Sequence, residues 1–269
     1  MSNIVEMFSY SFMIKALIVG ILISLCASLI GVSTVLKKNS MIGDGLSHVA
    51  FMTFALATIL HASPLYFSIP IVIIVSFFIL RLNNSNKVHG DSMIALVSAS
   101  SLAIGTFLIS VTKGVNIDIN NYLFGSILGV DTLDVIISII LAVLVITLYL
   151  IFYNKIFAIT FDETFSKSIG IKTNIYNAMF AILCSLVVVI GMRLMGSLLI
   201  SSLIIFPTLI SMQLFKKFKS VTISSIVISI ITFIIGLILS YVFSSPTGAT
   251  IVIVNIILFI VAKVISMLK

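Results

Sequence analysis

Hydrophobic residues in this chain are grouped into long runs, and short polar segments separate one run from the next. A helix that spans a membrane needs about 20 consecutive, mostly apolar residues, and most of the runs are that long. Only Arg193 separates the sixth run from the seventh, and the second begins with polar residues, so a re-entrant or broken segment would reduce the count to eight. The nine predicted spans are residues 9–36, 43–61, 65–81, 92–112, 132–153, 174–192, 194–215, 221–243 and 248–266.

The composition agrees with this pattern. Only 9% of the residues are charged and 61% are hydrophobic, whereas soluble domains average about 25% charged residues. No polar stretch is long enough to form a soluble domain, so residues 1–269 are interpreted as one all-α, polytopic integral membrane domain. Cys26 and Cys184 both fall inside apolar runs, which does not suggest a disulfide framework. The N-terminus lacks the pattern of a cleavable signal.

The basic residues predict the orientation. If the spans alternate in direction, twelve of the 15 Lys and Arg residues fall on one side, and only Lys15, Lys113 and Arg193 fall on the other. Cytoplasmic loops carry such an excess, so the C-terminus is predicted to be cytoplasmic. The N-terminus is then outside with nine spans and inside with eight. The net charge of +7 is explained by this topology and by attraction to anionic membrane lipid, so no nucleic-acid partner is expected.

Asp44 and His48 lie four residues apart at the start of the second predicted span, in the segment Met41–Ala50 (MIGDGLSHVA). A helix would place both side chains on one face, and a carboxylate with an imidazole suits zinc or manganese. Ionisable residues within a membrane segment are usually functional. The alternative is that Asp44 caps the helix by accepting hydrogen bonds from nearby amides, and that His48 is a structural histidine.

The remaining polar residues give no catalytic set. His61 and His89 are interpreted as solvated loop residues, Arg193 as a residue that extends its charge to the membrane surface, and Pro207 as a break in its span. The sequence has no GxxxxGK[ST] motif for nucleotide phosphates, no HExxH motif for a zinc peptidase and no GxSxG motif for a serine hydrolase. The chain is therefore not expected to be an enzyme.

Several stretches, taken in order and spacing, resemble the permease subunit of metal-ion ABC transporters, the zinc, manganese and iron uptake family. The likeness covers nearly the whole chain. The family pattern Gly-Asp-Ala-Leu-Ser-His is matched at residues 43–48, except that Gly45 replaces the alanine, which is expected to loosen the helix or to let a neighbour approach closely. The stretches are Leu36–Phe51, Asp118–Asp134, Phe161–Ile171, Met195–Pro207 and Ser245–Ile253.

The resemblance implies an assembly in the cell membrane. It consists of two permease copies, two cytoplasmic ATPase subunits that hydrolyse ATP, and an extracytoplasmic metal-binding protein. The resemblance also implies that Asp44 and His48 coordinate the transported divalent cation, which is cargo and not a permanently bound cofactor. The residues that follow His48, Val-Ala-Phe-Met-Thr, favour zinc over manganese or iron. An ATP-independent cation transporter or channel and a metal-dependent intramembrane enzyme are the alternatives from other classes.

An importer permease also needs a cytoplasmic element that contacts its ATPase, and the connection 154–173 is the longest one predicted on that side. Residues 162–169 are predicted to form a short helix with acidic residues first, a lysine later and a glycine after its end. Its apolar side chains, four residues apart, would line one face and dock in a groove of the ATPase, or lie on the lipid surface. The residues of this docking element are Phe161, Asp162, Glu163, Phe165, Lys167, Ile169 and Gly170.

Overall fold

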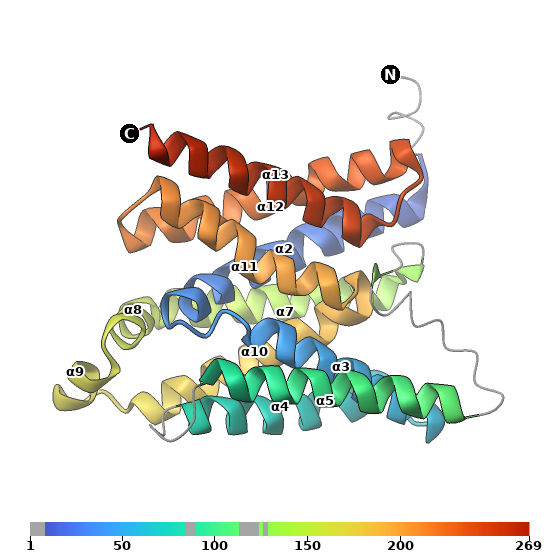
Figure 1. Ribbon diagram of the computed structural model, residues 1–269, viewed down its shortest axis with the longest axis horizontal. Helices are drawn as coiled ribbons and strands as arrows, with labels where there is room; N and C mark the ends of the chain where they lie inside the picture. The colour runs from blue at the N-terminus through green and yellow to red at the C-terminus, as the bar shows by residue number, and fades with distance from the viewer. Residues whose placement is uncertain (1–8, 84–89, 113–123, 126–128, 269) are drawn as a thin grey trace.

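The computed structural model describes residues 9–83, 90–112, 124–125 and 129–268, and the long regular elements in these ranges are all helices (Figure 1). The predicted all-α class is therefore confirmed. The elements are α2 (Ser11–Leu36), α3 (Ile42–Ile59), α4 (Pro64–Asn83), α5 (Gly90–Val111), α7 (Thr132–Ile151), α8 (Tyr153–Phe161), α9 (Glu163–Ser168), α10 (Thr173–Met195), α11 (Ser197–Leu214), α12 (Phe218–Phe243) and α13 (Thr247–Met267).

The long helices coincide with the predicted spans, and their ends differ from the prediction by a few residues at most. Within the described ranges, eight helices are long and apolar enough to cross a membrane. The ninth, α4, has a shorter described apolar segment, Pro64–Leu80, and packs against α3 and α10. The prediction of eight to nine membrane helices is thus confirmed.

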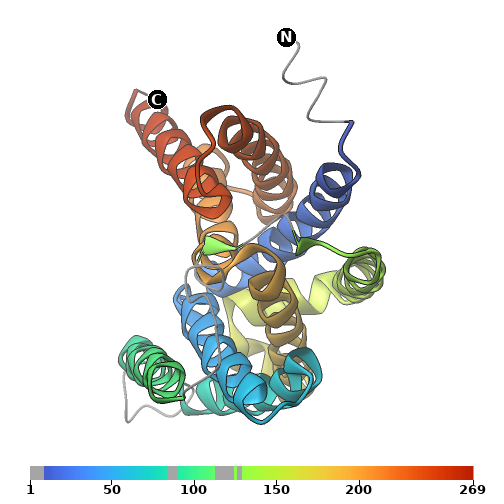
Figure 2. The ribbon, with the colours of Figure 1, turned by 90° about the vertical axis from the view of Figure 1, so that its right-hand side faces the viewer.

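The bundle has an inner and an outer set of helices. In α2, α3, α10 and α11, between 61% and 72% of the residues in the apolar stretch of each helix are buried. In α5, α7, α12 and α13, that share is 22% to 33% (Figure 2). Small residues let α2 approach its neighbours closely: Gly31 lies against the carbonyl of Ile204 on α11, and Gly20 lies against the ring of Phe233 on α12. Close approach at small residues is the usual basis of helix packing in lipid, where apolar burial gives no net gain.

One prediction about a helix boundary is wrong. Arg193 does not separate the sixth and seventh helices, because α10 continues to Met195 and the break falls at Gly196. Gly196 has φ 87°, a backbone conformation that glycine adopts without steric cost. Pro207 lies inside α11, which runs through it to Leu214, so the predicted span 194–215 continues past the proline. Membrane helices tolerate such prolines because neighbouring groups satisfy the freed carbonyl.

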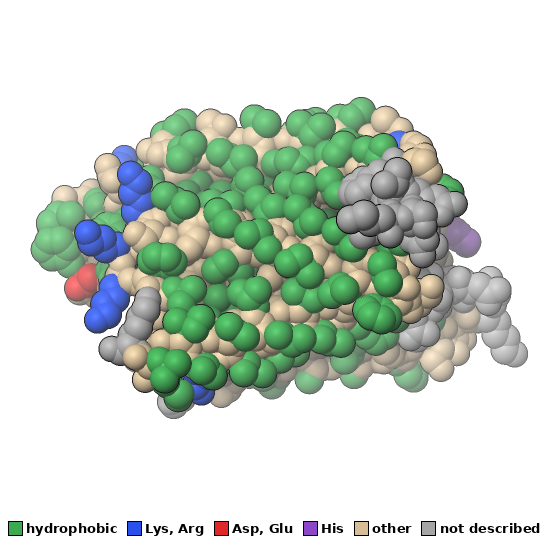
Figure 3. Space-filling model, turned by 90° about the horizontal axis from the view of Figure 1, so that it is seen from above, with side chains coloured by type: hydrophobic (Ala, Val, Ile, Leu, Met, Phe, Trp, Pro, Cys, Tyr) green, Lys and Arg blue, Asp and Glu red, His purple; other side chains and the backbone are tan. Residues whose placement is uncertain are grey.

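The two ends of the bundle differ in charge. The start of α2 and the end of α13 lie at opposite ends of the molecule, and α8 and α9 lie at the same end as the last residues of α13 (Figure 1). A broad apolar surface occupies the middle, and Lys and Arg side chains gather mainly at the end that carries α8 and α9 (Figure 3). Of the cations predicted for the other side, Lys15 and Arg193 both contact the first turn of α7, at Thr132 and Asp134.

Candidate metal site

Asp44 and His48 lie on one face of α3, at its beginning. The helix starts at Ile42, so Asp44 is in the first turn and His48 one turn later. The His48 Nε2 atom is 3.6 Å from the Asp44 Oδ1 atom. The N-terminal cap is Met41, and within the described part of the chain the Asp44 carboxylate contacts His48 and Ser98 and not backbone amides. The geometry therefore does not support the alternative that Asp44 caps this helix.

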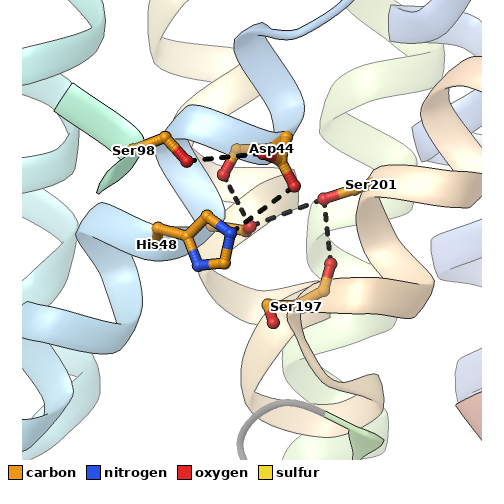
Figure 4. A network of polar contacts seen from close by, with 6 residues as sticks. Asp44, His48, Ser98, Ser197 and Ser201 are labelled. Carbon is orange, nitrogen blue, oxygen red and sulfur yellow. Dashed lines mark hydrogen bonds and ion pairs between the residues drawn. The ribbon is translucent and has the colours of Figure 1, made fainter. Parts of the chain in front are cut away.

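Hydroxyl groups from two other helices surround the pair (Figure 4). Ser98 of α5 donates a hydrogen bond to Asp44 Oδ2 at 3.4 Å. Ser47, between the two ionisable residues, donates to the Asp44 carbonyl at 2.8 Å, and its Oγ lies 3.4 Å from that of Ser201 on α11. Ser201 in turn donates to the carbonyl of Ser197 at 2.9 Å. The site is thus built at the junction of α3, α5 and α11.

The two ring nitrogens of His48 have different surroundings. Its side chain is only 17% exposed, while that of Asp44 is 38% exposed. Its Nδ1 atom is buried and, among the described residues, has no hydrogen-bond partner. Buried polar atoms in proteins nearly always have a partner, and an unpaired one is not what a structural histidine should have. The alternative that His48 is a satisfied structural histidine therefore lacks support.

The separation of the two donors fits a shared cation. His48 Nε2 and Asp44 Oδ1 are 3.6 Å apart. If each were bonded to one ion at about 2.1 Å, the angle between the two bonds would be roughly 120°. The described residues contain no group of three or more His, Cys, Asp and Glu side chains that could hold a metal. The other ligands would then be neutral oxygens, such as serine hydroxyls or water. A pair of strong ligands completed by weak ones suits an ion that must also leave.

Gly43 and Gly45 bring neighbouring helices close to the pair. A β-carbon at position 45 would lie 2.7 Å from Cγ2 of Ile94 on α5, and one at position 43 would lie 2.8 Å from Cδ1 of Ile204 on α11. The helix is regular through both glycines. The expectation that Gly45 loosens the helix is therefore wrong, and the close approach that glycine also permits is what the structure contains.

The predicted docking helix is present as α9. The Asp162 side chain caps it by accepting a hydrogen bond from the Phe165 amide at 2.8 Å. Within the helix, Lys167 Nζ lies 2.8 Å from Glu163 Oε1. Gly170 follows the C-terminal cap with φ 85°. The predicted helix at 162–169 is confirmed, with its ends shortened by one residue each.

Phe161 does not belong to this helix, so the prediction that it shares one helical face with Phe165 is wrong. Asp162 has extended backbone angles, φ −149° and ψ 99°, which end α8 at Phe161. The Phe161 ring packs against Phe157 and Phe218, with ring centroids 4.9 Å and 6.0 Å away. Phe165 remains 59% exposed, and Ile169, at the C-terminal cap, remains 56% exposed.

Sequence reasoning missed Ser98 and Ser201. Serines are frequent in the apolar runs of this chain, so neither position stands out in the sequence. Arg193 also differs from the expectation: its Nη2 atom lies 3.3 Å from Oδ1 of the buried Asp134, so it pairs with a carboxylate. His61 is exposed in the turn after α3, as predicted, and His89 lies outside the described residues.

The fold and the site define a polytopic helical membrane protein with a carboxylate–imidazole pair inside its bundle. Residues 9–266 match the model of the ABC 3 transport family. The chain belongs to this family and is a metal ABC transporter permease, a multi-pass protein of the cell membrane. Membership of this family favours an ABC permease over the two alternatives, an ATP-independent carrier and an intramembrane enzyme.

Relatives with different metals in their names resemble the chain about equally. The manganese import system permease protein ScaB of Streptococcus gordonii is 30% identical over 94% of this chain and 91% of its own length. The high-affinity zinc uptake system membrane protein ZnuB of Haemophilus influenzae is 26% identical over 94% of this chain and 97% of its own length. A chain of PsaBC from Streptococcus pneumoniae, solved in complex with Fab, has a TM-score of 0.85 and 27% identity, covering 97% of this chain and 94% of that one.

Proposed function

We propose that residues 1–269 form one permease domain of an ATP-driven importer of divalent metal ions, and that Asp44 and His48 hold the ion as it passes. The observation that carries the proposal is the pair itself. The Oδ1 atom of Asp44 and the Nε2 atom of His48 face each other at 3.6 Å within a membrane bundle, as two ligands of one cation would. Such residues are costly in a membrane, and the passage of a cation explains why they are kept.

Zinc is the favoured cargo in this proposal, and manganese is the second candidate. An imidazole and a carboxylate are ordinary ligands of zinc, and the residues after His48 favour it. Two observations favour manganese: the additional donors near Asp44 are the hard hydroxyl oxygens of Ser98 and Ser47, and the 30% identical relative is named for manganese.

The proposed assembly contains a second permease copy, cytoplasmic ATPase subunits that hydrolyse ATP, and an extracytoplasmic protein that delivers the metal. The end of the bundle with α8, α9 and the C-terminus would face the cytoplasm, and the lysines and arginines gathered there support this orientation. The docking element would be α9, because it is a capped helix outside the bundle that exposes Phe165 next to Ile169.

The test is ATP-dependent metal uptake by the complete importer in proteoliposomes, with zinc and manganese supplied separately and in competition. Asp44→Asn and His48→Ala each remove one of two strong ligands, so both should abolish uptake while membrane insertion and assembly stay normal. His61→Ala is the matched control, because His61 is exposed in a turn. Normal uptake by both site variants would refute the metal role of the pair, and the preferred ion in competition decides between the two metals.

A further inference from the structure

The helix α9 packs beside α8 and α10 and exposes its large apolar side chains. Phe165, within it, and Ile169, at its C-terminal cap, are more than half exposed. Ser166 is its buried residue, and the Ser166 hydroxyl donates to the carbonyl of Asp162 at 2.7 Å, inside the same segment. Glu163, the first residue of α9, interacts with charged and polar side chains on other helices.

Asn177 joins Glu163 to the end of α2. The Glu163 carboxylate accepts hydrogen bonds from Lys167 and from the side chain of Asn177, which lies near the start of α10. The Asn177 Oδ1 atom accepts a hydrogen bond of 2.9 Å from Nζ of Lys37, the C-terminal cap of α2. One amide group thus bridges a carboxylate on α9 and an ammonium group on α2. All three segments lie at the end of the bundle that carries α8 (Figure 1).

The charges in this bridge attract one another. Burial lowers the pKa of Lys37, and the negative charge of Glu163 opposes that shift. Partial burial acts to raise the pKa of Glu163, but the hydrogen bonds from Lys167 and Asn177 and the charges of Lys167 and Lys37 outweigh it and hold the pKa below its ordinary value. Glu163 is therefore ionised at neutral pH, and its attraction to Lys37 acts between α9 and α2.

The connection from Lys37 to the metal pair is short and hydrogen-bonded. The Lys38 amide donates to the carbonyl of Val35 at 3.0 Å and the Asn39 amide to that of Thr34 at 2.9 Å, which is the Schellman pattern of a helix end. Lys38 takes the left-handed conformation of this motif, with φ 61°. The Ile42 amide then donates to the Asn39 carbonyl at 3.1 Å, and Ile42 is the first residue of α3.

We propose that Asn177 and Lys37 are positioning residues that carry movement of α9 to Asp44 through the turn between α2 and α3. The inference rests on the proposed docking of the ATPase at α9. When the ATPase moves α9, Glu163 and Asn177 displace Lys37, and the hydrogen-bonded turn displaces the first turn of α3. Asp44 then shifts relative to Ser98 and Ser201, which lie on other helices, and its hold on the ion changes.

The experiment compares Asn177→Leu and Lys37→Met with the wild-type importer, reconstituted with its ATPase and binding protein. Asn177→Leu keeps the branched shape and the number of side-chain heavy atoms and removes both amide contacts, and Lys37→Met keeps most of the stem and removes the ammonium group. Each should lower the number of ions transported per ATP hydrolysed by roughly threefold or more, while the metal affinity of the purified permease and its assembly with the ATPase stay unchanged. The double variant should lose no more than the worse single variant, because both residues act in one path.

Two controls separate this effect from general damage. Lys38→Met removes an exposed neighbouring ammonium group and should leave the coupling ratio unchanged, and Lys37→Arg should retain most of it. The proposal is overturned if Lys37→Met couples as well as the wild type. It is also overturned if the variants lose assembly or metal affinity and keep their coupling ratio. If Phe165→Asp uncouples transport and these variants do not, the bridge is refuted and the docking role of α9 stands. If Phe165→Asp also transports normally, the docking role itself has failed.

Discussion

Gly45 of α3 lies directly against Ile94 of α5, so close that a β-carbon at position 45 would stand 2.7 Å from Cγ2 of Ile94. Ser98, which donates a hydrogen bond to Asp44, lies one helical turn after Ile94 on the same face of α5. The spacing between α3 and α5 at Gly45 therefore also sets the distance between Ser98 and the Asp44 carboxylate.

Gly45→Ala should weaken metal binding and slightly destabilise the protein. The added methyl group gains about 1 kcal/mol of helix propensity, but overpacking against Ile94 costs about 1–3 kcal/mol and moves α5 away from Asp44. Metal affinity and thermal unfolding of the purified permease measure the two effects. The second change Ile94→Ala makes room for the methyl group and should restore much of the affinity. A single variant that binds metal as the wild type does would show that the spacing at Gly45 is unimportant for the site.

The membrane helices and the Asp44–His48 pair could be predicted because both are local in sequence. Apolar runs define the spans, and a spacing of four residues places two side chains on one helical face. Ser98 and Ser201 could not be predicted, since they come from helices distant in sequence, and nothing local indicates which helices pack against α3. The end of α8 at Phe161 was missed because it depends on the backbone of Asp162. This residue leaves the helical conformation so that its side chain can cap α9.

Arg193→Met should destabilise the protein by about 1–3 kcal/mol, because it leaves the buried carboxylate of Asp134 without the guanidinium 3.3 Å away. The double variant Arg193→Met with Asp134→Asn should recover part of this loss, since no unpaired charge then remains. Lys15→Met is the control, because the Lys15 hydrogen bond to Thr132 is exposed. Thermal unfolding in detergent measures all three variants. Equal stability of Arg193→Met and the wild type would mean that the hydrogen bond from the Asp131 amide to Asp134 Oδ2, 3.1 Å long, satisfies the carboxylate without Arg193.

Reporter fusions should place the ends of the chain on opposite sides of the membrane. A reporter after Lys269 should behave as cytoplasmic, as should one inserted near Asn86, while one inserted near Asn116 should behave as extracytoplasmic; both insertion points lie outside the described residues. With nine spans, a tag before Met1 should be accessible from outside intact cells. An inaccessible N-terminal tag would reduce the number of spans to eight, and an extracytoplasmic C-terminus would overturn the orientation.

Phe165→Asp should uncouple ATP hydrolysis from transport while metal binding at Asp44 and His48 survives. Phe165 is 59% exposed on a helix that is capped at its start by Asp162, so its ring is available to a partner without any change in the bundle. A carboxylate in its place would have to be desolvated in an apolar groove of the ATPase, which is costly without a paired cation. Phe165→Leu is the matched control, because it keeps an apolar side chain and should retain most of the coupling. Co-purification with the ATPase, ions transported per ATP, and metal affinity are the three measurements. If the aspartate variant assembles and transports normally, Phe165 faces lipid or water in the working importer, and another segment must carry the force of ATP hydrolysis into the bundle.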